Sequence, residues 1–206
     1  MTTKDPVRQR ILAAARDLFA QRGYDGTSVR DITARAKANL AAITYHFGSK
    51  EALFHAVIQT VSEPLVEAVA QAAQGPGTPL QRIELALRAA NQHVQARPWA
   101  PPVMLRELAS GGRLPEPLVQ AWKRNVTTLV GLITAGQQDG SIRAGDPLLL
   151  ALSAVGQVFF FRVGGRIAQE AARVDLNSPE VSSQLIEHII ETVRRSLANY
   201  PMKAEP

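Results

Sequence analysis

The stretch TSVRDITARAKANLAAITYHF, Thr27–Phe47, decides the fold of the amino-terminal part of this chain. It contains two short runs of apolar residues at helical spacing, one ending near Ala36 and the other running from about Asn39 to Phe47. The segment Lys37-Ala38 leaves room for only a tight turn between the two predicted helices. We expect the Thr27 hydroxyl to cap the first of these helices by accepting a backbone N–H of its first turn.

A further helix is predicted ahead of this stretch. Asp5 and Pro6 suit its N-cap and first position, and Gly23 suits its end. Three short helices, the last two joined by a tight turn, predict a helix-turn-helix whose third helix lies in the major groove of DNA. Many small helical bundles share this spacing, so the residues on the third helix have to strengthen the prediction.

The remainder of the chain also has helical periodicity. Ser49 is expected to cap a fourth helix with apolar residues as far as Val61, and Pro64 is expected to kink or restart that helix. The apolar run Leu148–Phe161 is too short to cross a bilayer, so we read it as a buried helix and expect no membrane partner. No alternating strand pattern occurs in the sequence, and the predicted fold class is all-α.

The distribution of charge favours a polyanionic partner. The formal net charge is +5, and up to residue 55 nine Lys and Arg stand against five Asp and Glu. A basic amino-terminal quarter on a nearly neutral body is typical of a chain that holds nucleic acid by one end. The alternative is that these charges only solvate helix surfaces.

The composition excludes several classes of function. The chain has no cysteine, which excludes a disulfide framework, a thiolate zinc site and a cysteine nucleophile. Its polar start carries no signal peptide, so a cytoplasmic location is expected. No phosphate-binding glycine loop, nucleophile elbow or paired-histidine metal motif occurs, so we expect no enzyme activity, no cofactor and no metal. A helical scaffold that binds only other proteins remains as an alternative.

The predicted third helix carries side chains that suit DNA. Leu40, Ala41 and Ala42 are small or apolar groups that can approach base edges and touch thymine methyl groups. Asn39 and Thr44 can hydrogen-bond to bases or phosphates. The polar groups that follow and suit phosphate oxygens are Tyr45, His46 and Lys50.

Three stretches of the amino-terminal quarter share the pattern of a known family. They are Ile11–Tyr24 (ILAAARDLFAQRGY), Thr27–Ile32 (TSVRDI) and Ala41–Phe54 (AAITYHFGSKEALF). In order, they resemble the first helix, the start of the second helix, and the recognition helix with the head of the connecting helix in the tetracycline-repressor (TetR) family of bacterial transcription regulators. The resemblance spans about residues 7 to 60, and Asn39–Ala42 resembles the AcrR-like members.

The resemblance implies a DNA-binding role for individual residues. Those that it implies contact phosphates are Thr27, Tyr45, His46 and Lys50. Those that it implies face the groove are Asn39, Leu40, Ala41 and Thr44. Two positions depart from the family: Lys37 replaces the usual glycine of the turn, and Thr44 replaces a frequent tyrosine. A left-handed Lys37 costs about 1 kcal/mol and can add a phosphate contact.

The resemblance also implies a dimeric repressor that binds a palindromic operator and is released by a small-molecule effector. The expected division is a DNA-binding domain at 1–48, a connecting helix at 49–63 and a helical effector-binding and dimerisation domain at 64–206. A dimer has to hold the two reading helices roughly 34–36 Å apart. We expect the helices at 148–161 and 181–197 to pair across a two-fold axis; the alternative is that both are internal core.

Side chains beyond the amino-terminal quarter are candidates for an effector pocket. The candidate apolar walls are Met104, Trp122 and Phe160. The candidate polar anchors are Arg106, Asn125 and Gln157. These residues predict a small, largely apolar ligand; the alternative is that they belong to the ordinary core.

Overall fold

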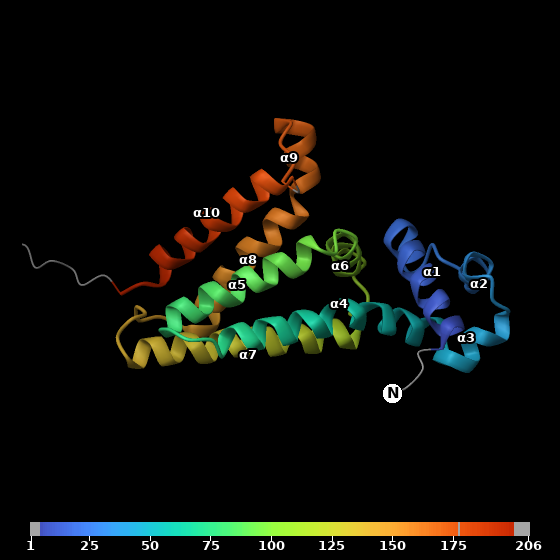
Figure 1. Ribbon diagram of the computed structural model, residues 1–206, viewed down its shortest axis with the longest axis horizontal. Helices are drawn as coiled ribbons and strands as arrows, with labels where there is room; N and C mark the ends of the chain where they lie inside the picture. The colour runs from blue at the N-terminus through green and yellow to red at the C-terminus, as the bar shows by residue number, and fades with distance from the viewer. Residues whose placement is uncertain (1–4, 177, 200–206) are drawn as a thin grey trace, which may run out of the picture. The chain divides into compact units, whose positions relative to one another are not determined.

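The computed structural model describes residues 5–176 and 178–199, and the regular elements among these residues are all helices (Figure 1). A single isolated antiparallel bridge, between Ile142 and Ala198, also occurs within this part of the chain. The prediction of an all-α fold is therefore confirmed. The helices are α1 (Pro6–Arg22), α2 (Val29–Ala36), α3 (Leu40–Phe47), α4 (Lys50–Ala73), α5 (Pro79–Gln95), α6 (Ala100–Ala109), α7 (Glu116–Gln138), α8 (Pro147–Val163), α9 (Gly165–Ala172) and α10 (Pro179–Leu197).

The chain divides into two compact units. The first comprises the residues up to Glu63 together with Pro98–Gln120, and the second comprises Pro64–Arg97 together with the residues from Ala121 onward. The helix α6 and the beginning of α7 thus belong with the amino-terminal helices, which differs from the expected single domain at 64–206. The reason is packing, because Val103 and Leu118 are buried in the same core as the amino-terminal helices.

The fourth helix, α4, is continuous through Pro64, where the sequence predicts either a kink or a restart of the helix. Ser49 caps it as predicted, since the Ala52 N–H donates to Ser49 Oγ at 3.0 Å. The helix then continues through Pro64 to Ala73, so it does not restart at the proline. A proline inside a helix costs about 3 kcal/mol or more, and the burial of neighbouring side chains such as Val61 helps to offset that loss.

The core of the first unit is built from side chains of its amino-terminal helices. Ile11, Ile32 and Leu53 are fully buried there. The Phe19 ring meets the Phe54 ring edge-on, with centroids 4.8 Å apart. Burying each such side chain contributes about 1.5–3 kcal/mol, and this core therefore positions the short helices α2 and α3 against α1 and α4.

The second unit has its own core, to which α10 contributes its apolar stripe. Ile189, Ile190 and Val193 are at most 1% exposed and pack with buried residues of α5, α7 and α8. The expectation that the stripe at 181–197 forms an interface between two chains is corrected here, because these side chains are already packed inside one chain. The alternative given for α10, that its apolar residues belong to the internal core, is the one that the structure shows.

The helix α8 divides its apolar residues between the core and the surface. Ala154 and Val158 are buried, whereas Leu149 and Phe160 are 62% and 69% exposed. With Gly156 between them, the two exposed residues recur at helical spacing along one face. This face of α8 is therefore available to a partner, in contrast to the apolar stripe of α10.

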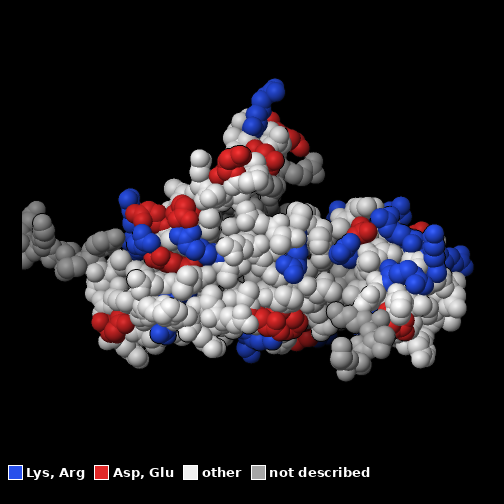
Figure 2. Space-filling model, viewed as in Figure 1, with Lys and Arg blue, Asp and Glu red and all other residues white. Residues whose placement is uncertain are grey.

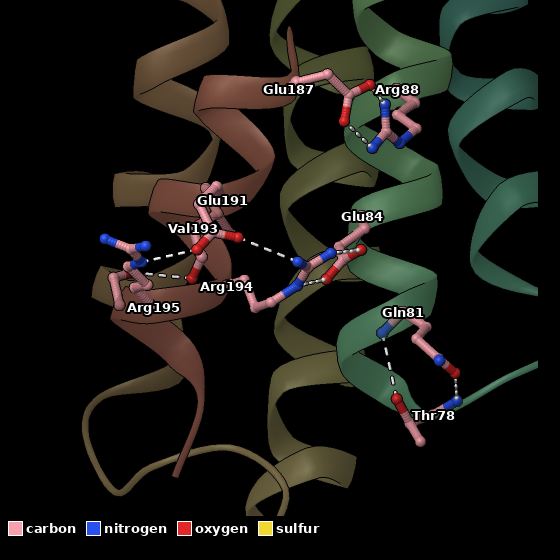
Figure 3. A network of polar contacts seen from close by, with 10 residues as sticks. Thr78, Gln81, Glu84, Arg88, Glu187, Glu191, Val193, Arg194 and Arg195 are labelled. Atoms are coloured by element: carbon pink, nitrogen blue, oxygen red, sulfur yellow. Dashed lines mark hydrogen bonds and ion pairs between the residues drawn. The ribbon is translucent and has the colours of Figure 1, made fainter. Parts of the chain in front are cut away.

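Ion pairs join α5 to α10 at the surface of the second unit (Figure 3). The Arg194 guanidinium donates to Glu84 at 2.8 Å, and Arg88 forms a two-pronged pair with Glu187. The hydrogen bond from Arg88 holds the pKa of the Glu187 carboxyl below its ordinary value. Exposed pairs contribute little stability, so the buried apolar side chains beneath them hold the two helices together.

Candidate nucleic-acid interface

Ser28 is the N-cap of α2. The Ser28 hydroxyl accepts a hydrogen bond from the Asp31 N–H at 3.1 Å, and the Ser28 N–H donates to Asp31 Oδ2 at 3.1 Å. The hydrogen bond from the Ser28 hydroxyl, followed by that from its N–H, holds the pKa of the Asp31 carboxyl below its ordinary value. This reciprocal capping box fixes the first turn of α2 through local contacts alone.

Thr27 differs from both expectations made for it. Its side chain is 1% exposed, and its hydroxyl donates to the Gly23 carbonyl oxygen at 2.8 Å. The predicted capping role is wrong because Ser28 fills it. Thr27 also cannot make the phosphate contact that the resemblance implies, because its hydroxyl is buried and closes the turn that follows α1.

The turn between α2 and α3 has the left-handed geometry that the family resemblance implies. Lys37 has φ 50° and ψ 50°, which is the left-handed region that glycine adopts most easily. The turn is closed by a hydrogen bond of 3.0 Å from the Ala38 N–H to the Thr33 carbonyl oxygen. The Lys37 side chain is exposed, so its ammonium group remains available to a polyanion.

The helix α3 is anchored through one face and open on the other. The Asn39 side chain caps it by accepting a hydrogen bond from the Ala42 N–H at 2.8 Å. Ile43 is 2% exposed and packs into the core of the first unit. The residues of α3 that remain exposed are Leu40, Ala41, Thr44 and Tyr45.

His46 does not belong to that exposed face. Only 11% of its side chain is exposed, and its Nδ1 lies 3.5 Å from Oδ2 of Asp5, the N-cap of α1. The imidazole thus joins the end of α3 to the start of α1, which corrects the expectation that it points toward phosphates. A pattern-based reading misses this contact because the two residues are far apart in the sequence.

Tyr45 and Lys50 keep groups that can reach a phosphate. The Tyr45 side chain is 85% exposed, and its ring meets the His46 ring edge-on at 4.8 Å. The Lys50 ammonium lies 4.1 Å from the centroid of the Tyr24 ring, which places it by a cation–π contact. Lys50 is partly exposed, so a phosphate could replace solvent on its open side.

Basic side chains gather around the amino-terminal helices. Figure 2 shows Lys and Arg concentrated over α1 and α2 on the viewed face. Three arginines of the amino-terminal helices are in ion pairs: Arg16 with Asp17 at 2.8 Å, Arg35 with Asp17 at 3.3 Å and Arg22 with Asp31 at 3.8 Å. The exposed basic residues of this region are Arg8, Arg10, Arg22, Arg30, Arg35 and Lys37. The surface is therefore suited to a polyanion, as the charge distribution predicts.

The six residues expected in an effector pocket are not gathered within one unit. Met104 packs against the core of the first unit, and the exposed Arg106 side chain lies against Gly23 of the same unit. The other four belong to the second unit: Trp122, Asn125, Gln157 and Phe160. Of these, Trp122 and Phe160 are more than half exposed, which is unlike the wall of an enclosed pocket.

A polar groove of about 440 Å³ lies between α5 and α10 of the second unit. Its lining includes Arg88, Asn91 and Gln95 from α5, and Ser183 and Glu187 from α10. None of the six expected pocket residues lines it. The sequence carries a signal for this groove, because the three polar residues of α5 recur at helical spacing on a face that also holds Gln81, Glu84 and Gln92.

Two kinds of site are absent from the described part of the chain. Residues 5–176 and 178–199 contain no group of three or more His, Asp or Glu side chains that could hold a metal ion. No helix among these residues is both long enough and apolar enough to span a bilayer.

Comparison with known proteins shows that the amino-terminal region is similar in sequence to bacterial transcription regulators. Residues 11–57 match the family described as bacterial regulatory proteins, tetR family. The HTH-type transcriptional repressor Rv3405c of Mycobacterium tuberculosis is 45% identical over 64 residues, which cover 31% of this chain and 34% of that protein. The match thus spans about a third of the length of this relative.

Solved structures extend the likeness to both units. FadR from Bacillus subtilis, solved in complex with stearoyl-CoA, has a TM-score of 0.76 at 19% identity, covering 91% of this chain and 98% of that one. The regulator PfmR from Thermus thermophilus has a TM-score of 0.68 at 23% identity, covering 88% and 97%. At these identities the likeness shows a shared fold.

Proposed function

We propose that this chain is a member of the tetR family of bacterial regulatory proteins, whose model its residues 11–57 match, and that it is a dimeric transcriptional repressor released from a palindromic operator by a small molecule. The observation that supports DNA binding best is the geometry of α3. Its buried Ile43 and its Asn39 cap hold the helix rigidly, while Leu40, Ala41 and Thr44 remain exposed. A short helix held in this way matches the reading element of a helix-turn-helix.

The proposed DNA-binding surface combines that reading helix with nearby cationic and phenolic groups. We assign base contacts to Leu40, Ala41 and Thr44, and phosphate contacts to Lys37, Tyr45 and Lys50. These last three side chains are at least partly exposed: Lys37 precedes α3, Tyr45 lies within it and Lys50 follows it. Thr27 and His46 are left out, because the first is buried and the second faces Asp5.

We propose that α8 supplies the apolar part of a dimer interface. Its exposed Leu149 and Phe160 form a stripe that would pack against the same stripe of a second copy. Pairing of this kind would hold two reading helices at a fixed distance, which a palindromic operator requires.

The effector is proposed to bind within the second unit. FadR, which shares the fold, was solved with stearoyl-CoA. In this chain the polar groove between α5 and α10 is one candidate site, and its lining suits a polar ligand rather than the largely apolar ligand that the sequence predicts. The helix α4 runs from Lys50 to Ala73 through the boundary between the units, so movement at its carboxyl end could shift its amino end and the adjoining α3.

The experiment that tests DNA binding is a selection of duplexes from a randomised library by the full chain, followed by affinity measurements at rising salt. We expect a palindromic consensus and a steep fall in affinity with salt, because basic side chains displace counterions. Lys50→Ala should weaken binding to every duplex and reduce the salt slope by about 1. Lys123→Ala, which removes an exposed lysine from α7 of the second unit, is the matched control.

The same experiment separates this proposal from the alternatives. A cytoplasmic helical scaffold that binds only proteins, or an enzyme, would select no duplex. Binding that is insensitive to salt between low and physiological concentrations would contradict the proposed phosphate contacts.

A further inference from the structure

The part of α3 that we assign to the groove carries a single hydrogen-bonding side-chain group, the Thr44 hydroxyl, while the exposed Tyr45 phenol is assigned to a phosphate. The helix sequence LAAITYHF, Leu40–Phe47, contains no Lys, Arg, Asp, Glu, Asn or Gln. At the face that we assign to the groove, Leu40 is 53% exposed, and Ala41 and Thr44 are also exposed. This face thus presents an isobutyl group, a methyl group, and a methyl group with one hydroxyl.

The polar residues at the two ends of α3 are already engaged. The Asn39 side-chain oxygen accepts the hydrogen bond from the Ala42 N–H that caps the helix, so the amide cannot present both its oxygen and its nitrogen to an adenine. His46 turns toward Asp5 and has 11% of its side chain exposed. Guanine is most often read by a two-pronged contact from Arg or Lys, and α3 carries neither.

One base group in the major groove complements such an apolar face. The C5-methyl group of thymine is the only methyl group that the four ordinary base pairs present there. We infer that α3 reads thymine through this methyl group, with Leu40, Ala41 and the Thr44 methyl as its contacts. The operator half-site would therefore carry thymines beneath these residues. This inference rests on the proposed function, since it names the DNA sequence class that the proposed site prefers.

The test uses the duplex selected by the full chain. Each thymine of one half-site is replaced singly by uracil, which removes the methyl group and leaves pairing with adenine unchanged. Affinity is measured by fluorescence anisotropy at fixed salt. We expect one or more positions at which uracil weakens binding about fourfold, the value of one buried methylene-sized group. At the same positions, 5-methylcytosine should bind more tightly than cytosine.

A variant of the protein tests whether the preference for thymine over uracil comes from α3. Leu40→Ala should reduce the difference between thymine and uracil at one position of the half-site and leave the other positions as they were. Leu105→Ala removes a leucine with 41% exposure from α6 of the same unit and should leave every thymine preference unchanged. Circular dichroism of both variants checks that the helices remain folded.

The outcomes for the inference and for the proposed function can be told apart. If the chain selects a specific operator and replacing all its thymines by uracil leaves affinity unchanged, the inference is overturned and the repressor function stands. If Leu40→Ala and Leu105→Ala give the same thymine dependence, the assignment to α3 is overturned. A chain that selects no duplex at all overturns both.

Discussion

The helices α3 and α10 both carry apolar residues at helical spacing, yet they use them in opposite ways. In α10, Ile189, Ile190 and Val193 face the core of the second unit, whereas in α3 Ile43 is buried and Leu40 is 53% exposed. A helix packed along its whole length contributes mainly stability. A helix anchored at few points keeps exposed apolar groups that can contact a partner. Apolar residues at helical spacing in a sequence are compatible with either kind of helix.

The largest effect is expected from a charge placed in the α10 stripe. Ile189→Asp should lower the free energy of unfolding by about 4 kcal/mol or more, because it puts an unpaired carboxylate in a core position. Denaturant titration followed by circular dichroism measures this loss. Gln184→Asp, at an exposed position of the same helix, should change the free energy by no more than about 0.5 kcal/mol. Equal stability of the two variants would mean that Ile189 is not a core residue.

Within α3, truncating the anchor should cost much more stability than truncating the exposed leucine. Ile43→Ala should destabilise the chain by about 2–5 kcal/mol, since it leaves a cavity in the first unit. Leu40→Ala should stay within about 0.5 kcal/mol of the unmodified chain, because its side chain is largely in solvent. Denaturant titration again gives both values, and a reversed order would contradict the anchoring of α3.

The exposed stripe of α8 is expected to affect assembly without affecting folding. Phe160→Asp should raise the dissociation constant of the proposed dimer at least about tenfold, or by about 1.4 kcal/mol, because it places two carboxylates in an apolar interface. Sedimentation equilibrium at several concentrations measures the change. Thr127→Asp, an exposed position on α7, is the control. An unmodified chain that stays monomeric at every concentration would rule out the proposed interface.

The smallest expected effect is a gain in stability at the turn between α2 and α3. Lys37→Gly should stabilise the fold by about 1 kcal/mol, because glycine adopts the left-handed geometry without the steric strain of a β-carbon. Lys37→Ala removes the charge and keeps the β-carbon, so it should give no such gain. If both variants have the same thermal midpoint, the strain at Lys37 is not significant. Their DNA affinities separately measure the proposed phosphate contact.

Most of the local structure of the first unit could be predicted from the sequence. The Asp5 cap, the end at Gly23 and the cap at Ser49 all lie where residue type and spacing place them. The exception, Ser28 in place of Thr27, is a shift of one position that two neighbouring hydroxyl residues make hard to resolve. The roles of Thr27 and His46 could not be read from spacing, since each depends on a contact with a specific partner in the fold.

The sequence by itself determined the all-α class and the helix-turn-helix, because caps, turns and helical period depend on residues within a few positions of one another. The left-handed turn at Lys37 is expected only from the family resemblance, which places a glycine there. Only the tertiary structure decided which apolar faces are covered. It buried the α10 stripe, left Leu149 and Phe160 of α8 exposed, and joined Pro98–Gln120 to the first unit. These outcomes depend on contacts between segments distant in sequence, and helical periodicity marks an apolar face without identifying what packs against it.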